Sequence, residues 1–334
     1  PNPAIREAMQ SLCDDPDPRL AAVGLDVLRC RGGAPFAEVA TLIAHPDGGV
    51  RRSAARVLAM AEQRVAATEL LASQAGSELD EGVLATIAQG LLKLDDRRGL
   101  VVVRSRLADE AGFPGSLPRR ARLALLRLLA LCGDGSDLAT LLALADRPAE
   151  IELLGWYGHA DVVPPLLEVL TERCSPALYS TAETRPLAAA RALQRITAAM
   201  EPRSAPRGVG YRPDAVMPDP TVWAAWWDEH RARFEPGIKH RHGRPFTVEA
   251  SLDELCADGA AQDVRECAAL ELSMLSGGVP APWLGGWSSR LVAELADWTA
   301  HFRQFTQPTG KPLHAPGEWP ARRLGERHRT VAAG

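Results

Sequence analysis

A recurring phrase constrains the fold of this chain more than any other feature of its sequence. It consists of a short polar segment containing Asp or Pro, followed by a run of small apolar residues. The four copies are "DPDPRLAAVGLDVL" near residue 14, "HPDGGVRRSAARVLAMA" near 45, "SLPRRARLALLRLLAL" near 116 and "AQDVRECAALELSML" near 261. In the second copy, one helical face is formed by Val50, Ala54, Val57, Leu58 and Ala61. Because Asp and Pro are typical of helix N-termini, each copy predicts the start of a helix.

A second apolar helix is expected a short polar turn after each of these runs. The segments concerned are "FAEVATLIA", "AATELLASQ", "DLATLLALA" and "VVPPLLEVL". Copies return at intervals of about 30 to 38 residues, and alternating β-branched segments are almost absent. Helical pairs of this length bury a core only by stacking on their neighbours. The sequence therefore predicts an all-α fold, an α-solenoid of about five or six helical pairs.

The repeats resemble HEAT repeats. In that superfamily an Asp near the turn commonly pairs with an Arg at the start of the next helix of a neighbouring repeat. Asp17 with Arg19, and Asp47 with Arg51, stand at matching places in this chain. The resemblance implies a ladder of ion pairs between repeats. A patch of arginines that binds nucleic acid is the alternative interpretation of the same residues.

Pro and Gly interrupt the helical pattern between residues 201 and 220, and this stretch is expected to be a loop or linker. The HEAT-like repeat array is therefore expected to cover residues 1–200. A C-terminal helical unit with one further HEAT-like repeat is expected at 221–305. The Pro/Gly/Arg-rich segment 306–334 is expected to be a disordered or extended tail.

Composition narrows the class of protein. The net charge is only −4, and no run of about eighteen apolar residues could span a bilayer. The first residues, "PNPAIREAMQ", lack the basic start and apolar stretch of a signal peptide. Six scattered cysteines with no C-x-x-C pair argue against a disulfide framework and a zinc site. We therefore expect a cytoplasmic protein with reduced thiols and no membrane insertion.

Three tryptophans lie within five positions of the segment 221–244, although only 5% of the residues are aromatic. Asp219 is suited to cap a helix, Pro220 to open it, and the Pro-Gly pair at 236–237 to end it. On this helix an apolar stripe is formed by Trp223, Trp226, Trp227, His230 and Phe234. We interpret the stripe as a core face, with a ligand cage or an exposed partner patch as alternatives. Removal of Trp227 is then expected to cost about 3–5 kcal/mol.

The basic segment that follows the aromatic helix raises the question of a metal site. His240 and His242 form an H-x-H pair with no nearby Cys or acidic cluster, and the surrounding basic residues repel a cation. We therefore expect no metal there. The segment is expected to be a solvated basic loop before a helix that starts near Thr247, or a surface that binds acidic side chains or a C-terminal carboxylate.

Signatures of catalysis and of nucleotide binding are weak. The stretches "GDGSD" and "GVGYR" contain G-x-G but lack a third glycine and a preceding strand. The sequence has no G-x-S-x-G, HExxH or P-loop pattern. No catalytic residue, cofactor or bound metal is therefore expected, and the chain is interpreted as a non-enzyme.

Three segments carry a more specific resemblance. They are "ELLGWYGHADVVPPLLEVL" (152–170), "AARALQRIT" (189–197) and "PDPTVWAAWWDEHRARFEPGIKHRHGRPFTVEASLDEL" (218–255), followed by "RECAALEL" (265–272). They resemble a family of bacterial HEAT-repeat proteins found in association with type VI secretion clusters. The pattern includes a Gly-aromatic-x-Gly turn, here at 155–158, and a Trp pair before a basic loop, here at 226–227 and 239–243. The usual Arg-Tyr of that loop is replaced by Lys239-His240.

The resemblance implies a cytoplasmic adaptor or chaperone that helps an effector or spike component reach the secretion machinery. The sequence therefore predicts a scaffold that binds another protein. A HEAT-like enzyme of the DNA glycosylase type is the alternative, although the mildly negative net charge argues against nucleic acid as a partner. Scaffolds unrelated to secretion and other enzymes, including HEAT-like lyases that act on chromophore attachment, stay open as well. The residues predicted to contact a protein partner are Arg119, Arg120, Arg122, Trp156, Tyr157, His159, Lys239, His240, Arg241 and His242.

Overall fold

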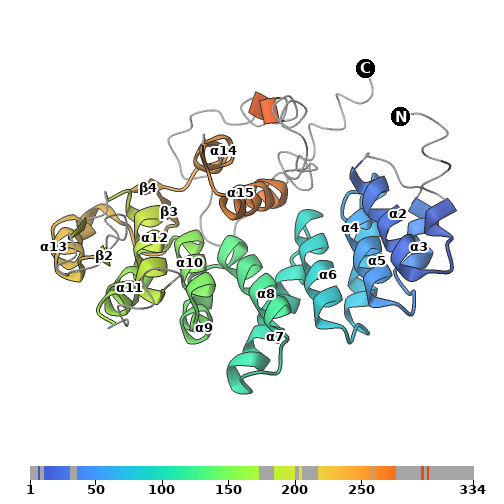
Figure 1. The fold of residues 1–334 in the computed structure, drawn as a ribbon, viewed down its shortest axis with the longest axis horizontal. Helices are drawn as coiled ribbons and strands as arrows, with labels where there is room; N and C mark the ends of the chain where they lie inside the picture. The colour runs from blue at the N-terminus through green and yellow to red at the C-terminus, as the bar shows by residue number, and fades with distance from the viewer. Residues whose placement is uncertain are drawn as a thin grey trace, which may run out of the picture. The chain divides into compact units, whose positions relative to one another are not determined.

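The structure is a computed structural model that describes residues 7, 11–30, 36–172, 184–199, 203–204, 217–257, 259–275, 295–296 and 299–300. This part is mostly helical, which confirms the all-α prediction (Figure 1). The chain divides into two compact units. Unit 1 comprises Pro1–Leu125, Ser251–Gln307 and Trp319–Gly334, and unit 2 comprises Leu126–Ala250 and Pro308–Glu318.

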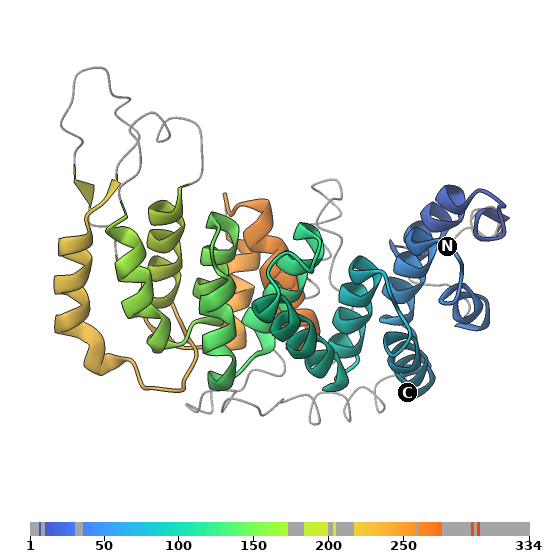
Figure 2. The ribbon, with the colours of Figure 1, turned by 90° about the horizontal axis from the view of Figure 1, so that it is seen from below.

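Unit 1 contains consecutive helical pairs. The helices are α2 (Pro18–Cys30), α3 (Phe36–Leu42), α4 (Gly48–Leu58), α5 (Arg64–Ala75), α6 (Glu81–Lys93) and α7 (Arg98–Gly112). The first helices of successive pairs pack against one another, α2 on α4 and α4 on α6. The second helices pack beside them, α3 on α4 and both α5 and α7 on α6 (Figures 1 and 2). Each pair is thus covered by its neighbour in two layers of helices.

Three further helices complete the described part of unit 1 or cross its boundary. Helix α15 (Gln262–Leu275) packs on α6. Helix α8 (Arg119–Cys132) and helix α14 (Val248–Cys256) run across the division between the units. All four recurring phrases of the sequence therefore form helices, namely α2, α4, α8 and α15.

Aspartates start several helices of unit 1 by capping them. The Asp47 carboxylate accepts hydrogen bonds from the amides of Gly49 and Val50, at 2.8 and 3.1 Å. Asp80 receives the equivalent pair at the start of α6, and Asp17 accepts from the amide of Arg19 at the start of α2. These bonds satisfy amides that have no partner inside the helix.

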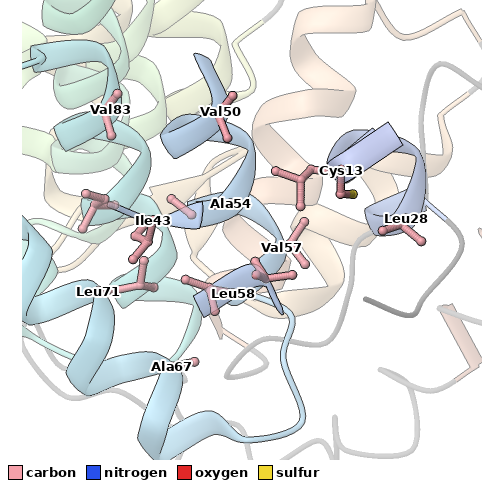
Figure 3. Packing of buried hydrophobic residues seen from close by; sticks show 14 of the residues in the cluster. Cys13, Leu28, Ile43, Val50, Ala54, Val57, Leu58, Ala67, Leu71 and Val83 are labelled. Carbon is pink, nitrogen blue, oxygen red and sulfur yellow. The ribbon is translucent and has the colours of Figure 1, made fainter. Parts of the chain in front are cut away.

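The predicted apolar stripe of α4 lies in the core of unit 1. Val50, Ala54, Val57 and Leu58 are buried, and Ala61 is packed against them (Figure 3). Other positions of α4 are buried as well, because the helix lies between α2 and α6 and is not confined to one face of a layer. Small residues at these positions allow helices to approach closely on both sides.

Ion pairs connect successive helical pairs, but with partners other than those expected. The Asp47 carboxylate caps its own helix. The Arg51 guanidinium instead forms two 2.8 Å hydrogen bonds with the buried carboxylate of Glu78. It also donates to the carbonyls of His45 and Pro46. Arg51 therefore ties the turn before α4 to the turn before α6.

Unit 2 contains shorter helices and two antiparallel strand pairs. The helical elements are η1 (Gly135–Asp137), α9 (Leu138–Leu144), α10 (Pro148–Tyr157), η2 (Ala160–Val162), α11 (Val163–Leu170), α12 (Arg185–Thr197), α13 (Pro220–His230) and η4 (Arg231–Arg233). The strands are β1 (Arg203–Ser204) with β2 (Met217–Pro218), and β3 (His240–Arg241) with β4 (Arg244–Pro245). Helix α12 packs on both α10 and α11, and α11 packs on α13 (Figure 2).

Gly155 allows α10 and α12 to pack closely. A Cβ at this position would lie 2.8 Å from the Cα of Ala192, closer than side-chain atoms approach. This explains in physical terms the first glycine of the Gly-aromatic-x-Gly pattern.

The aromatic helix starts as predicted. Asp219 caps α13 through the amides of Thr221 and Val222, and Pro220 occupies its first turn. The α-helix ends at His230 and continues as the single 3₁₀ turn η4, before the predicted stop at 236–237. Of the predicted stripe, Trp223 and Phe234 are buried.

The remaining three members of that stripe, Trp226, Trp227 and His230, are only half-buried. The core interpretation therefore holds fully for only part of the stripe.

Some predictions fall outside the described residues. These are the tail 306–334, most of the stretch 201–220 and parts of the C-terminal unit 221–305, so the sequence-based boundaries stay predictions. None of the helices in the described ranges has the length and apolar character that a membrane span requires.

Candidate functional site

Two segments singled out in the sequence lie against each other in unit 2. The turn at the end of α10, residues 155–159, contacts the β3–β4 hairpin, residues 239–245. The amide of His240 donates to the Gly158 carbonyl at 2.8 Å, and His159 forms an isolated antiparallel bridge with Lys239. The amide of Phe246 then donates to the Lys239 carbonyl at 2.8 Å. The hairpin is thus joined to the end of α10 through its backbone.

Gly158 is required at this contact for two reasons. Its φ of 74° is a left-handed conformation that ends α10 and that residues with a Cβ rarely adopt. A Cβ at Gly158 would also lie 2.6 Å from the carbonyl oxygen of His240. The second glycine of the Gly-aromatic-x-Gly pattern is therefore explained by the docking of the hairpin.

The tip of the hairpin caps the C-terminus of α12. Its two turn residues, His242 and Gly243, both have positive φ, 52° and 74°, as in a type I′ turn. The amide of His242 donates to the Arg195 carbonyl at 2.7 Å, and the amide of Gly243 to the Ile196 carbonyl at 2.8 Å. These carbonyls belong to the last turn of the helix, where intrahelical donors run out.

The Lys239 side chain reaches the end of a third helix. Its ammonium group donates to the Leu131 carbonyl in the last turn of α8 at 3.3 Å, where a positive charge is favourable. Three residues after Leu131, the carbonyl of Asp134 accepts a hydrogen bond from the Tyr157 hydroxyl at 2.6 Å. The ends of α8, α10 and α12 are therefore all tied to residues of the turn or of the hairpin.

Cations and aromatic rings fill the space beneath the hairpin. The Arg195 and Arg241 guanidinium carbons lie 4.3 and 4.5 Å from the centroid of the Trp156 ring. Arg241 and Lys239 also lie over Phe246, at 5.1 and 4.8 Å. Interactions of this kind are stronger when the cation is removed from water, and Arg241 is only 1% exposed.

Two histidines are buried at the same contact. His159 stacks on the Tyr157 ring at a centroid distance of 4.2 Å, and His240 lies 5.0 Å from the ring of Phe234. Burial, with the positive charges of Lys239 and His240, lowers the pKa of His159 to about 4. Burial also lowers the pKa of His240, against the opposing effect of its hydrogen bond to the Ile238 carbonyl. Both imidazoles are therefore neutral at pH 7.

Half of the side chains predicted to contact a partner are buried. The prediction of direct contact does not hold for five of them, because their side chains form the interior of unit 2. The expected solvated basic loop is also wrong, since the segment is a docked hairpin. The buried residues are Trp156, Tyr157, His159, His240 and Arg241.

The other five predicted residues differ in their environments. Lys239 is half-buried and His242 is exposed at the tip of the hairpin. Arg119 and Arg120 are exposed in the first turn of α8, within unit 1. Arg122 is only 11% exposed and lies 3.5 Å from the buried carboxylate of Glu110. The structure thus brings together the turn and the hairpin in unit 2, while the three arginines belong to unit 1.

Arg195 and Phe246 are members of this cluster that sequence reasoning missed. The type I′ turn had a detectable signal, since Gly at its second position between two short extended segments favours a hairpin. For Arg195 the sequence held no such signal, because arginine near a helix C-terminus is common on exposed faces.

The chemistry available at the hairpin is that of packing and capping. The carboxylates, imidazoles and thiols of the described residues form no group of three or more that could hold a metal ion. The contacts given above use the hairpin amides, the Lys239 ammonium group and the Arg241 guanidinium to join helix ends. The arrangement is therefore suited to a structural role.

An exposed surface of a different kind lies on the second helices of unit 1. Val65 on α5 is 78% exposed and Val101 on α7 is 64% exposed. Between them, the Glu69 carboxylate accepts hydrogen bonds from the Arg98 guanidinium at 2.7 and 3.2 Å. Because Val65 is one turn from Glu69 and Val101 one turn from Arg98, the four side chains share one face. We name these four residues the α5–α7 surface.

Two more large apolar side chains are exposed next to these helices. Leu79 follows α5 and is 91% exposed, and Phe113 follows α7 and is 78% exposed. Unit 1 therefore exposes several large apolar groups on and beside its second helices, and it also exposes Leu20 and Val23 on the first helix α2, at 41% and 52%.

Comparison with known proteins adds no family. A scan of the sequence against protein-family models finds no match, and a search of curated proteins finds none either.

Proposed function

We propose that this chain is a non-catalytic scaffold that binds another protein, built as an α-solenoid of HEAT-like repeats. The observation that carries the proposal is the α5–α7 surface, where two exposed valines flank the ion pair of Glu69 with Arg98, whose guanidinium also pairs with Asp96. A surface of this composition is suited to the apolar face of a partner segment. The stacked pairs of unit 1 support the solenoid, because the second helices of such repeats present a continuous surface.

The resemblance to proteins associated with type VI secretion supplies the finer proposal. In this proposal the chain is a cytoplasmic adaptor or chaperone, and its partner is an effector or a spike component. The exposed Arg119 and Arg120 would add contacts to carboxylates of that partner. Such contacts weaken as salt screens them, whereas the apolar contacts do not.

The test is a comparison of immobilised wild-type chain with the double variant Val65→Ser/Val101→Ser. Proteins from a bacterium with a type VI secretion cluster are passed over both at low and high salt and identified by mass spectrometry. The proposal expects a secretion component retained by the wild type and lost from the variant. A matched control is Val222→Ser, which changes an exposed valine of unit 2.

Two results would contradict the proposal. One is that no protein is retained at either salt concentration while a small molecule copurifies. The other is a shift of DNA by the wild type at low salt, which would favour the glycosylase-type alternative.

A further inference from the structure

The hairpin 239–245 has a further property, which concerns how firmly it is held at different pH values. Its attachment to unit 2 depends on backbone hydrogen bonds from His240, His242 and Gly243 to the ends of α10 and α12. The side chains at the centre of this attachment are His159 and His240, which are 3% and 1% exposed. Any change in their charge therefore acts at the contact itself.

Each imidazole has a buried ring nitrogen without a hydrogen-bond partner among the described residues. These atoms are Nδ1 of His159 and Nε2 of His240. In His240 the Nδ1 atom lies 2.9 Å from the Ile238 carbonyl, which can only accept, so Nδ1 carries the proton and Nε2 is a bare acceptor. A proton added at Nε2 of His240 or at the His159 ring would create a buried cation at a ring that lacks a hydrogen-bond partner for it among the described residues.

The charged groups around these rings do not offset such a cation. From the hairpin, Lys239 and His240 oppose a charge on His159. From the loop and η1 after α8, Asp134 and Asp137 favour it, but more weakly than burial and Lys239 disfavour it.

Around His240, Glu235 favours protonation, yet burial outweighs it. The neighbouring rings of Tyr157 and Phe234 add no opposite charge, and Arg241 and Arg195 on Trp156 bring further positive charge to the same region.

We propose that the hairpin 239–245 is an acid-sensitive clasp: protonation of His159 and His240 detaches it from the ends of α10 and α12. The proton that binds each ring comes from solvent and is accommodated by opening, which returns the imidazole to water. The opened state frees the carbonyls of Arg195 and Ile196 and uncovers Trp156. The fold thus contains a segment whose attachment depends on two neutral histidines.

The direction of the effect follows from linkage. The pKa of such a buried histidine is lower in the closed state than its ordinary value of about 6.5. Above about pH 6.5 the imidazole is neutral in both the closed and the opened state, so it does not affect the opening equilibrium. As the pH falls from about 6.5 towards the folded pKa of His159, about 4, the opened state binds the proton and the closed state does not. At about pH 5 this raises the opening constant of the hairpin about thirtyfold from His159 alone.

Hydrogen exchange of the full chain at several pH values tests the proposal. The amides of His240, His242 and Gly243 are followed from about pH 7.5 to about pH 5, after correction for the intrinsic exchange rate. In the wild type their protection is expected to fall by more than about thirtyfold, because His240 adds to the effect of His159, while the helix amides of α4 and α6 keep theirs. In His159→Phe/His240→Asn the fall is expected to vanish, because Phe preserves the ring stack and Asn can still donate to the Ile238 carbonyl.

A matched control removes the exposed histidine of the same hairpin. His242→Asn keeps a residue that tolerates positive φ in a type I′ turn, and it should show the same loss of protection as the wild type. The proposal is overturned if wild-type protection does not depend on pH, or if the His159→Phe/His240→Asn variant loses protection equally. Should that variant fail to fold, His240→Asn alone is expected to show a smaller fall than the wild type, and an undiminished fall would contradict the clasp.

Discussion

At the scale of single residues, the side chains that looked most like a binding site are occupied in holding the fold. Arg241 is the clearest case, since its guanidinium lies over the rings of both Trp156 and Phe246 and the residue is almost fully buried. A cation in a binding site must be able to contact a ligand, whereas the Arg241 guanidinium packs on the rings of Trp156 and Phe246. The same holds for Gly158, which is selected by backbone conformation and by the space that the hairpin leaves.

Replacement of Gly158 tests this structural role. In Gly158→Ala the new Cβ would meet the His240 carbonyl at 2.6 Å in a left-handed conformation, so we expect the free energy of unfolding to fall by more than about 2 kcal/mol. Gly237→Ala is the matched control, because Gly237 has a similar φ of 73° and a Cβ there would have no described neighbour within 4 Å. There we expect a loss of about 1 kcal/mol. Equal losses in urea denaturation would contradict the close docking of the hairpin.

Glu78 leads to a prediction about pH in unit 1. Burial would raise its pKa, but hydrogen bonds from Arg51, from the amide of Asp80 and from Gln74 outweigh burial and lower it to about 2. The stabilisation is therefore present above the ordinary pKa of about 4.5 and is lost as the pH falls towards 2. Glu78→Gln should lower the free energy of unfolding by about 2–3 kcal/mol at pH 7.

The pH dependence separates this effect from simple loss of packing. The difference between the wild type and Glu78→Gln, measured by urea denaturation, should narrow between about pH 5 and about pH 3. Glu69→Gln is the control, because Glu69 also pairs with an arginine but at an exposed site, where a small change is expected. A constant difference for Glu78→Gln across this range would contradict the assignment.

At the scale of helices and strands, α13 shows where periodicity succeeds and where it fails. The stripe correctly identified the inward face of the helix, but its members differ in burial. Trp223 is 1% exposed, whereas Trp227 is half-buried and contacts the ring of Phe234 at 5.2 Å. Trp223→Ala should therefore cost about 3–5 kcal/mol and Trp227→Ala clearly less, contrary to the value expected from the sequence. Thermal melts of both variants decide, and an equal or larger effect of Trp227→Ala would refute the burial order.

Helices were predictable from local pattern because Asp caps and apolar spacing act within a few residues of each other. Asp47 and Asp219 cap the helices at which the sequence placed them. The hairpin was not predicted, since its attachment depends on Gly158 and on the end of α12, which are distant in the chain. Burial of Arg241 could not be predicted either, because a basic run is most often solvated and only the tertiary contacts with Trp156 and Phe246 reverse that expectation.

At the scale of the molecule, residues that hold the fold are distinct from the residues proposed to meet a partner. The hairpin and the turn at the end of α10 belong to the first group, and the α5–α7 surface belongs to the second. The comparisons with known proteins identify no family, so the assignment depends on this separation. This separation can be tested with one variant expected to change stability and one expected to change binding.

The most direct measurement records both the melting temperature and the retention of the partner for Arg241→Met and for Val65→Ser/Val101→Ser. Because Arg241 is buried on two rings, Arg241→Met should lower the melting temperature while the fraction that remains folded still binds. The double valine variant should keep the wild-type melting temperature, since both side chains are exposed, and should lose the partner. The reverse result, a stable Arg241→Met that no longer binds and a double variant that binds normally, would contradict the account.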